Sequence, residues 1–250
     1  MKKIKIISII AIAFLSVGTL ISGCSLAGLN LQKDYNRSTT DTIDAHLYKT
    51  AWAYMKARAY GSATDTIFRR MYDGVIYSGI DTNEYTKPNR TYIFLQNNTI
   101  INITKNATTG VITKTGLWIS YTVNGAQATS WASYSKTDVK NYLSYLILLG
   151  SYTHTNLPVT KDAEYQTLAP AGVYTTNPVT FKAPGTFNTN PKSTMMVHVS
   201  NANTVTSQLD YPIVLNQTTN IDVSDLLATN GVIDVIRGTN TVPFFFPAAQ

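Results

Sequence analysis

Apolar residues recur at helical spacing in three stretches of the chain, residues 44–61, 62–79 and 137–150. In each stretch they return at i, i+3 or i+4, which places them on one face of a helix. The residues on these faces are Leu47, Ala51, Tyr54, Met55 and Arg58, then Ile67, Phe68, Met71, Tyr72 and Val75, and then Val139, Tyr142, Leu143, Leu146 and Ile147. We therefore predict three helices, all within the first 150 residues.

Capping and stop signals set the expected ends of these helices. Ser62 with Asp65 three positions later resembles a capping box at the start of the second helix. Thr137 is the expected N-cap of the third helix, with Asp138 in its first turn. Glycine favours helix C-termini, and the expected stops are Gly61, Gly74, Gly79 and Gly150.

Runs of β-branched and aromatic residues predict strands between and after the helices. These runs are residues 91–96, 111–113, 117–123, 164–168, 194–199, 211–215 and 232–236. Asn124 and Gly125 both tolerate positive φ, so they predict a hairpin turn that pairs residues 117–123 with 128–134. Pro212 places its strand at a sheet edge or a strand start. The pattern as a whole predicts an α+β fold dominated by strands.

The first residues have a different pattern, a basic start followed by an apolar run. Lys2, Lys3 and Lys5 precede the run Ile6 to Ile21, and Ser22 and Gly23 stand before Cys24, the one cysteine in 250 residues. A signal peptidase needs small side chains beside its cleavage point, and a thiol can carry a diacylglyceryl group. We predict a lipoprotein signal peptide at residues 1–23, lipidation of Cys24, and a flexible tether at residues 24–41. An uncleaved membrane helix is the alternative, although the run is short for a span.

This reading places the protein in a bacterial cell envelope, where its predicted partner is the membrane through the lipid anchor at Cys24. Ser25 does not resemble an inner-membrane retention signal, so we expect the outer membrane. Acylation of Cys24 leaves no thiol for a disulfide or a nucleophile. The formal charge falls from +6 to +3 when the three signal lysines leave, and the remaining charges are interspersed. We therefore expect no nucleic-acid partner.

Two groups of residues are candidates for ligand binding. Four aromatic residues of the expected hairpin could stack on sugar rings, or could pack across the strands as core, and we favour the core interpretation. These residues are Trp118, Tyr121, Trp131 and Tyr134. Arg69 and Arg70 lie opposite the apolar face of the second helix, where a solvated pair is favoured over an anion site.

Catalytic motifs are scarce in this sequence. It has no glycine-rich phosphate loop, no Gly-x-Ser-x-Gly elbow and no pair of histidines at metal-ligand spacing. His46, His154 and His198 fall in separate predicted elements, so we expect no metal site and no cofactor. Asp222, Asp225 and Asp234 could form a glycosidase pair with a distant carboxylate, although a capping role for Asp222 and a helical turn at Asp225 are favoured.

Three blocks of the chain resemble fasciclin-like domains. The first is Arg90-Thr91-Tyr92-Ile93-Phe94-Leu95-Gln96 with Asn97 and Ile100 after it, following two helices. The second is Leu143 to Ile147 with Gly150-Ser151-Tyr152, and the third is Ile221 to Ile236 with Pro243 beyond it. The resemblance implies a single domain at residues 42–243, a wedge of two packed β-sheets with helices in its N-terminal half. Insertions are expected near residues 101–135 and 169–192, and a tail at residues 244–250.

The chain also departs from the family pattern. Leu146 replaces the histidine of the Tyr-His pair that the family associates with adhesion, and Asp234 stands where the family usually has histidine. The third block implies a helical turn before Asn230 and Gly231, which are expected to reverse the chain in left-handed conformations. Leu146 also suits the buried face of its helix.

Three functions follow from these observations. The leading hypothesis is a non-catalytic, lipid-anchored adhesion or binding module that recognises a protein or a glycan. The second is an accessory component of an outer-membrane glycan-capture assembly. The third is an envelope glycoside hydrolase that uses Asp225 and Asp234.

Overall fold

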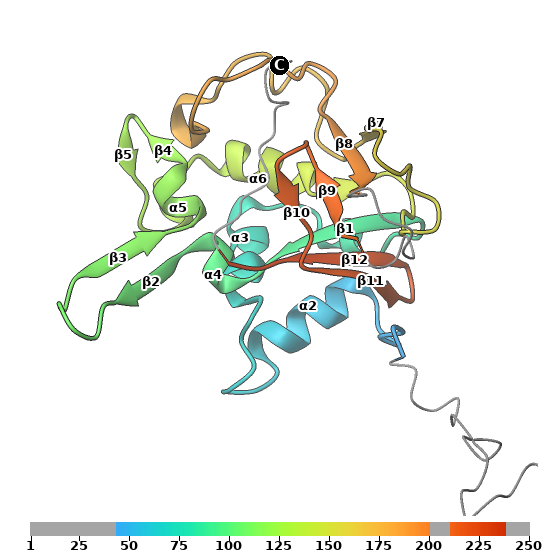
Figure 1. Ribbon diagram of the computed structural model, residues 1–250, viewed down its shortest axis with the longest axis horizontal. Helices are drawn as coiled ribbons and strands as arrows, with labels where there is room; N and C mark the ends of the chain where they lie inside the picture. Colours follow the sequence, from blue (N-terminus) through green and yellow to red (C-terminus); the bar gives the residue numbers. More distant parts are fainter. Residues whose placement is uncertain (1–43, 201–210, 239–250) are drawn as a thin grey trace, which may run out of the picture. The chain divides into compact units, whose positions relative to one another are not determined.

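The structure is a computed structural model, which describes residues 44–200 and 211–238 (Figure 1). Strand β1 (Arg90–Leu95) is an inner strand of a four-stranded sheet. The sheet order is β11 (Val223–Ala228), β12 (Gly231–Ile236), β1 and β6 (Ile147–Leu148). β1 runs parallel to β12 and antiparallel to β6. Five consecutive residues are buried in both β1 and β12, as expected for strands covered on both faces.

A second four-stranded sheet is formed by the part of the chain between β6 and β11. Its order is β10 (Thr219–Asn220), β9 (Ile213–Leu215), β8 (Thr194–Val199) and β7 (Ala163–Gln166), with every pair antiparallel. Each of the predicted runs at 164–168, 194–199 and 211–215 contributes a strand to this sheet. Pro212 directly precedes β9, so the prediction that it marks a strand start is confirmed.

The helices lie mostly in the N-terminal half. The principal ones are α2 (Ala51–Tyr60), α3 (Arg69–Ser78) and α6 (Lys136–Tyr145), with a 3₁₀ turn η3 (Thr82–Thr86) after α3. The first helix begins at Ala51 and not near Asp44, because residues 45–47 exchange backbone hydrogen bonds with Leu227 of β11. Gly61 is its C-cap, as predicted.

The second helix begins later than predicted and passes through one of its expected stops. The N–H of Asp65 donates to the Ser62 hydroxyl, yet the helix starts only at Arg69. Gly74 does not end it: a Cβ there would lie 2.7 Å from the Trp131 ring, so this glycine allows the close approach of that ring. Gly79 is the left-handed C-cap, as predicted.

The third helix also differs at both ends. Its N-cap is Ser135, whose hydroxyl accepts from the N–H of Asp138, and Thr137 lies inside the first turn. The helix ends at Tyr145, with Leu146 as its C-cap, before the expected stop at Gly150. Ile147 belongs to β6 because its backbone pairs with β1.

The middle of the chain contains the largest correction. Residues 117–123 do not form one strand: they form helix α5 and then the short strand β4, whose partner is β5. The elements here are α4 (Asn97–Ile100), β2 (Asn102–Lys105), β3 (Ile112–Thr115), α5 (Leu117–Ser120), β4 (Thr122–Val123), β5 (Ala126–Gln127) and η4 (Trp131–Ser133). The Asn124-Gly125 turn is confirmed, with both φ angles positive. Residues 128–134 contain η4 instead of the predicted strand, because α5 and η4 turn their aromatic rings into the core.

The C-terminal block is extended where a helical turn was expected. Asp225 lies in β11 with φ 57°, at an irregularity in the pairing with β12. Asp222 is no helix cap; its carboxylate accepts from the N–H of Arg237. Neither Asn230 nor Gly231 has a positive φ, so the chain reverses without the expected left-handed conformation. The one further named element is the 3₁₀ turn η5 (Val179–Phe181).

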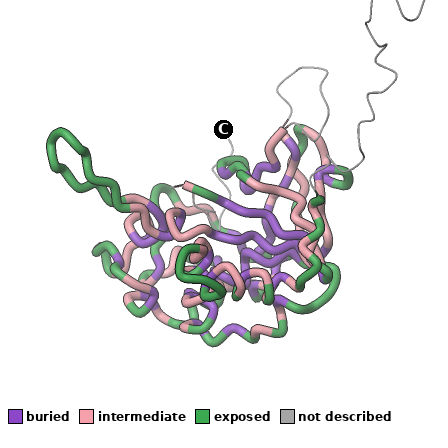
Figure 2. Tube along the Cα trace, turned by 90° about the horizontal axis from the view of Figure 1, so that it is seen from below, coloured by how far each residue is buried: buried purple, intermediate pink, exposed green. Residues whose placement is uncertain are grey.

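The predicted α+β class dominated by strands is confirmed, and the described residues from Ala45 onward belong to one compact unit. Figure 2 shows buried residues in the interior of the described chain and an exposed arm that projects from it. No described helix has the length and apolarity needed to cross a bilayer. The predicted signal peptide, Cys24, the tether, Pro243 and the tail lie outside the described residues.

Candidate functional site

The four aromatic residues considered for a sugar platform are core residues. Trp118, Tyr121, Trp131 and Tyr134 are all buried. The ring of Phe181 on η5 lies 4.8 Å from the Tyr121 ring and 4.6 Å from the Tyr134 ring, centroid to centroid. Their place in the core is therefore confirmed, although they do not pack across paired strands. A buried cluster offers no open face to a sugar.

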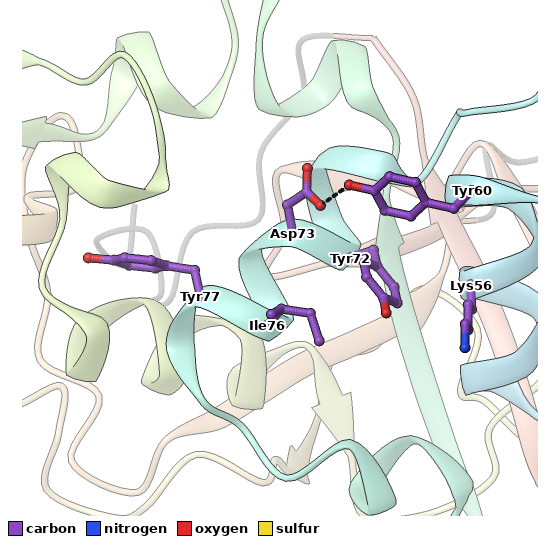
Figure 3. A pocket seen from close by; sticks show the side chains of 6 residues that line it. All are labelled: Lys56, Tyr60, Tyr72, Asp73, Ile76 and Tyr77. Carbon is purple, nitrogen blue, oxygen red and sulfur yellow. Dashed lines mark hydrogen bonds between the residues drawn. The ribbon is translucent and has the colours of Figure 1, made fainter. Parts of the chain in front are cut away.

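An open groove between α2 and α3 displays other aromatic rings (Figure 3). Its volume is about 550 Å³. Tyr60 follows Lys56 by four positions on α2, and Ile76 follows Tyr72 by four on α3, so each pair lies on one face of its helix. The lining residues are Lys56, Tyr60, Tyr72, Asp73, Ile76 and Tyr77.

Tyr60 is held rigidly although it is 50% exposed. Its hydroxyl donates a 2.5 Å hydrogen bond to Oδ1 of Asp73 on the neighbouring helix. The Arg69 guanidinium lies over the ring, 4.9 Å from its centroid, and the edge of the Tyr72 ring packs at 5.4 Å. The hydrogen bond to Asp73 is the main reason that the Tyr60 pKa is raised. The contacts with Asp73 and Arg69 therefore fix the position of the exposed Tyr60 ring before any ligand binds.

The other rings of the groove are also fixed by the fold. Tyr72 stacks on Trp52 of α2 at 5.1 Å between centroids. The Tyr77 hydroxyl donates to the carbonyl of Tyr134 at 2.7 Å, and the Lys136 ammonium lies 5.7 Å from the Tyr77 ring. A groove whose rings are already ordered loses little conformational entropy when it binds a ligand.

A second hollow adjoins the groove and shares Tyr60 and Lys56 with it. Its volume is about 330 Å³, and its other lining residues are Ala53, Ala57 and Gly61. Tyr60 therefore lines both hollows, so an extended ligand could contact its exposed surface from either one. The sequence pattern did not predict this groove. Tyr60 and Tyr72 belong to separate predicted helices, and the pattern does not show that these helices pack together.

The arginine pair does not form a joint anion site. The Arg69 side chain covers the Tyr60 ring. The Arg70 guanidinium is partly buried and donates to the carbonyl of Asn97 at 3.4 Å. The two side chains therefore have different surroundings and different contacts.

The structure brings together three candidate residues that are far apart or only loosely grouped in the sequence. Nδ1 of His154 lies 2.8 Å from Oδ2 of Asp225, and Nε2 lies 2.9 Å from the carbonyl oxygen of Tyr211. The N–H of Asp225 donates to Oδ1 of Asp234 at 3.0 Å. Burial raises the pKa of Asp234 to about 8. Asp222 is separate from this network.

The remaining histidines have other surroundings. Nδ1 of His198 lies 2.7 Å from Oδ1 of Asp162, whose second oxygen accepts from the Gln217 amide. His46 forms an isolated bridge to Leu227. Within residues 44–200 and 211–238, no group of three His, Cys, Asp or Glu side chains is arranged to hold a metal ion.

The chain was compared with protein-family models and with curated proteins, and neither comparison finds a match. The resemblance to fasciclin-like domains therefore stays a prediction, which depends on the residues quoted for it.

Proposed function

We propose that this protein is a lipid-anchored, non-catalytic binding module of a bacterial cell envelope, and that the groove between α2 and α3 binds a glycan. The observation that carries the proposal is the half-exposed Tyr60 ring, which is fixed by Asp73 and Arg69 and lines both hollows. An aromatic ring held open to solvent offers a face for the apolar C–H side of a sugar ring.

The polar groups of the groove also suit a sugar. Lys56 supplies ammonium donors and Asp73 supplies carboxylate acceptors beside the Tyr60 ring. Sugar hydroxyls both donate and accept hydrogen bonds, so a wall that offers both kinds of partner can orient them. Ile76, which is exposed, adds an apolar contact at the same groove.

The hydrolase alternative receives no support from the geometry. Asp234 is buried in the sheet, where its carboxyl group cannot reach a substrate bound at the surface. Asp225 is engaged by the ring of His154. A pair of carboxyl groups that flank a scissile bond must face a common open space. The accessory role in a glycan-capture assembly stays a prediction, because no described contact favours a particular protein partner.

Membership of the fasciclin-like class is part of this proposal. The first and third resembling blocks lie side by side as β1 and β12, in parallel register from Arg90 opposite Gly231 to Leu95 opposite Ile236. Blocks that are separated in sequence but paired in the core form one structural unit. This pairing supports the proposal that they belong together as one domain type.

A glycan array tests the binding function. The probe is the chain from residue 25 onward, because the described core lies wholly between Ala51 and Ile236. We expect Tyr60→Ala to weaken glycan binding about tenfold or more, since each tenfold corresponds to about 1.4 kcal/mol. Tyr48→Ala is the matched control: Tyr48 is 76% exposed and lies outside the groove.

Two results would overturn the proposal. One is the absence of binding to every glycan on the array, and the other is binding that Tyr60→Ala leaves unchanged. Tyr60→Phe refines the test, because it keeps the ring and removes the hydrogen bond to Asp73. We expect this variant to bind more strongly than Tyr60→Ala and less strongly than the unaltered chain.

A further inference from the structure

A two-stranded arm, residues 102–115, projects from the rest of the described chain (Figures 1 and 2). It consists of β2, a turn and β3, and neither strand pairs with a larger sheet. The register places Ile103 opposite Lys114 and Lys105 opposite Ile112. Because directly opposed residues and alternate residues of a strand share a face, these four side chains lie on one face of the arm.

The two faces of the arm differ in chemistry. The first, which we call the Ile/Lys face, carries Ile103, Lys105, Ile112 and Lys114, and the opposite face carries Asn102, Thr104, Thr113 and Thr115. Ile103 and Ile112 are 57% and 59% exposed, and Val111 next to the turn is 60% exposed. Ile103 and Ile112 form an unpartnered apolar surface on the Ile/Lys face, and Val111 adds an exposed aliphatic side chain beside the turn.

The stretch of sequence that contains the arm carries charge of one sign. The sequence has no Asp or Glu between Glu84 and Asp138, whereas this stretch has five Lys and Arg residues. On the arm itself, Lys105 and Lys114 are exposed, and no described carboxylate forms a salt bridge with either. The Ile/Lys face therefore complements a surface that is both anionic and apolar.

The turn at the end of the arm is held by hydrogen bonds among its own residues. Oδ1 of Asn106 accepts from the N–H groups of Thr108 and Thr109, each at 2.9 Å. The N–H of Gly110 donates to the Asn106 carbonyl, and the N–H of Asn106 donates to the Val111 carbonyl. Internal hydrogen bonds lower the cost of moving this turn from water into a headgroup region.

We propose that the Ile/Lys face docks on the surface of a lipid bilayer that contains anionic lipids. Aliphatic side chains enter the boundary between headgroups and acyl chains, while lysine stems extend along them and keep the ammonium groups among the phosphates. A protein interface would be expected to carry aromatic residues or arginine. Residues 101–115 have neither, and the same absence disfavours a glycan.

Vesicle co-sedimentation of the chain from residue 25 onward tests this proposal without the anchor at Cys24. The probes are vesicles of phosphatidylcholine alone and of phosphatidylcholine mixed with phosphatidylglycerol. We expect binding to the anionic vesicles that weakens with salt, and about fivefold weaker binding for each of Lys105→Gln and Lys114→Gln. The double variant Ile103→Asn, Ile112→Asn should lose binding, whereas Thr104→Asn, Thr113→Asn on the opposite face should retain it.

A second measurement reports directly on contact between the arm and the lipid. Ile112→Trp places a reporter on the Ile/Lys face, and its fluorescence should shift to the blue and be quenched by brominated lipids when anionic vesicles are added. Equal binding to both kinds of vesicle, no binding, or binding that the Ile/Lys variants leave unchanged would overturn the proposal. So would a dimer in sedimentation velocity that the double Ile variant dissociates. Glycan binding at the α2–α3 groove should be unaffected by every arm variant, so the two proposals fail separately.

Discussion

The backbone N–H of Asp225 donates a 3.0 Å hydrogen bond to Oδ1 of Asp234 across strands β11 and β12. Asp225 has φ 57° at this point, where the pairing of the two strands is irregular. Burial is the main cause that raises the Asp234 pKa to about 8; the Asp225 carboxylate adds to the rise, and the hydrogen bond opposes it. The Asp234 carboxyl group inside the sheet therefore stays protonated below about pH 8.

This raised pKa predicts a stability that falls as pH rises. The unfolded chain loses the proton at about pH 3.8, whereas the folded chain keeps it until about pH 8. The folded state therefore binds more protons between these values, and the contribution of Asp234 is full below about pH 4 and lost as pH rises through about 8. The slope reaches at most about 1.4 kcal/mol per pH unit.

Asp234→Asn isolates this effect, because the amide oxygen can still accept from Asp225. We expect urea unfolding to show that the unaltered protein loses stability between about pH 5 and about pH 8, and that the Asn variant loses much less. The same pH dependence in both proteins would contradict the prediction.

Asn230 connects four parts of the chain through one buried amide. Its Oδ1 accepts from the N–H of Ala51 at the start of α2, at 2.8 Å. Its Nδ2 lies within hydrogen-bonding distance of the Tyr85 and Lys87 carbonyls and the Tyr92 hydroxyl. We predict that Asn230→Ala costs about 3 kcal/mol of unfolding free energy, because it leaves buried polar groups unpaired.

Chemical denaturation measures this cost. Asn220→Ala is a suitable control, since Asn220 is exposed in the short strand β10, and we expect it to change stability by about 0.5 kcal/mol or less. If the two variants were equally stable, the hydrogen bonds of Asn230 would contribute nothing net.

Gly231 is required by the close approach of β1. A Cβ at this position would lie 2.1 Å from the carbonyl oxygen of Arg90, which belongs to the backbone of the parallel partner strand and cannot move aside. We predict that Gly231→Ala costs about 3 kcal/mol. Gly172→Ala is the control, because Gly172 has φ +89° but no atom within 4 Å of an added Cβ, and its cost of about 1–2 kcal/mol is conformational. Thermal unfolding that ranks Gly172→Ala as the more harmful change would contradict the steric explanation.

The hydrogen bond between Tyr60 and Asp73 predicts a specific titration. The Tyr60 pKa is raised above its usual value, chiefly by the Asp73 carboxylate that accepts from its hydroxyl, while Arg69 lowers it in part. We expect Asp73→Asn to lower this pKa toward the ordinary tyrosine value, since the amide carries no negative charge. The ring carbon shift of Tyr60 in an NMR titration measures it. An unchanged midpoint in the variant would show that the contact does not persist in solution.

Cys24 lies outside the described residues, and its predicted role is tested in cells. Cys24→Ser removes the thiol that would carry the lipid, so we expect the protein to leave the membrane fraction after a salt wash. Each acyl methylene buried in a bilayer contributes about 0.8 kcal/mol, so an anchor with more than one chain withstands the wash. Ser25→Ala keeps the thiol and should stay in the membrane fraction. Retention of Cys24→Ser in that fraction would contradict lipid anchoring.

Much of the fold could be predicted because it depends on local patterns. The apolar period within residues 62–79 predicted a helix, which forms as α3, and the runs at 91–96 and 194–199 predicted strands that form as β1 and β8. The Asn124-Gly125 turn formed because the conformational freedom of these two residues is local. The candidate site was predicted far less well: Tyr60 belongs to it only because α2 and α3 pack against each other.

Sequence by itself determined the α+β class, the three helical segments, most strands, and the shortage of catalytic motifs, since these depend on neighbouring residues. Tertiary structure alone decided which aromatic rings are buried and which are exposed, because burial depends on what covers a face. It also decided the roles of Asn230, which contacts Ala51 from 179 residues away, and of His154, which meets Asp225 from 71 residues away. Contacts at such separations leave no periodic signal in a single sequence, because nothing in the spacing of neighbouring residues records them.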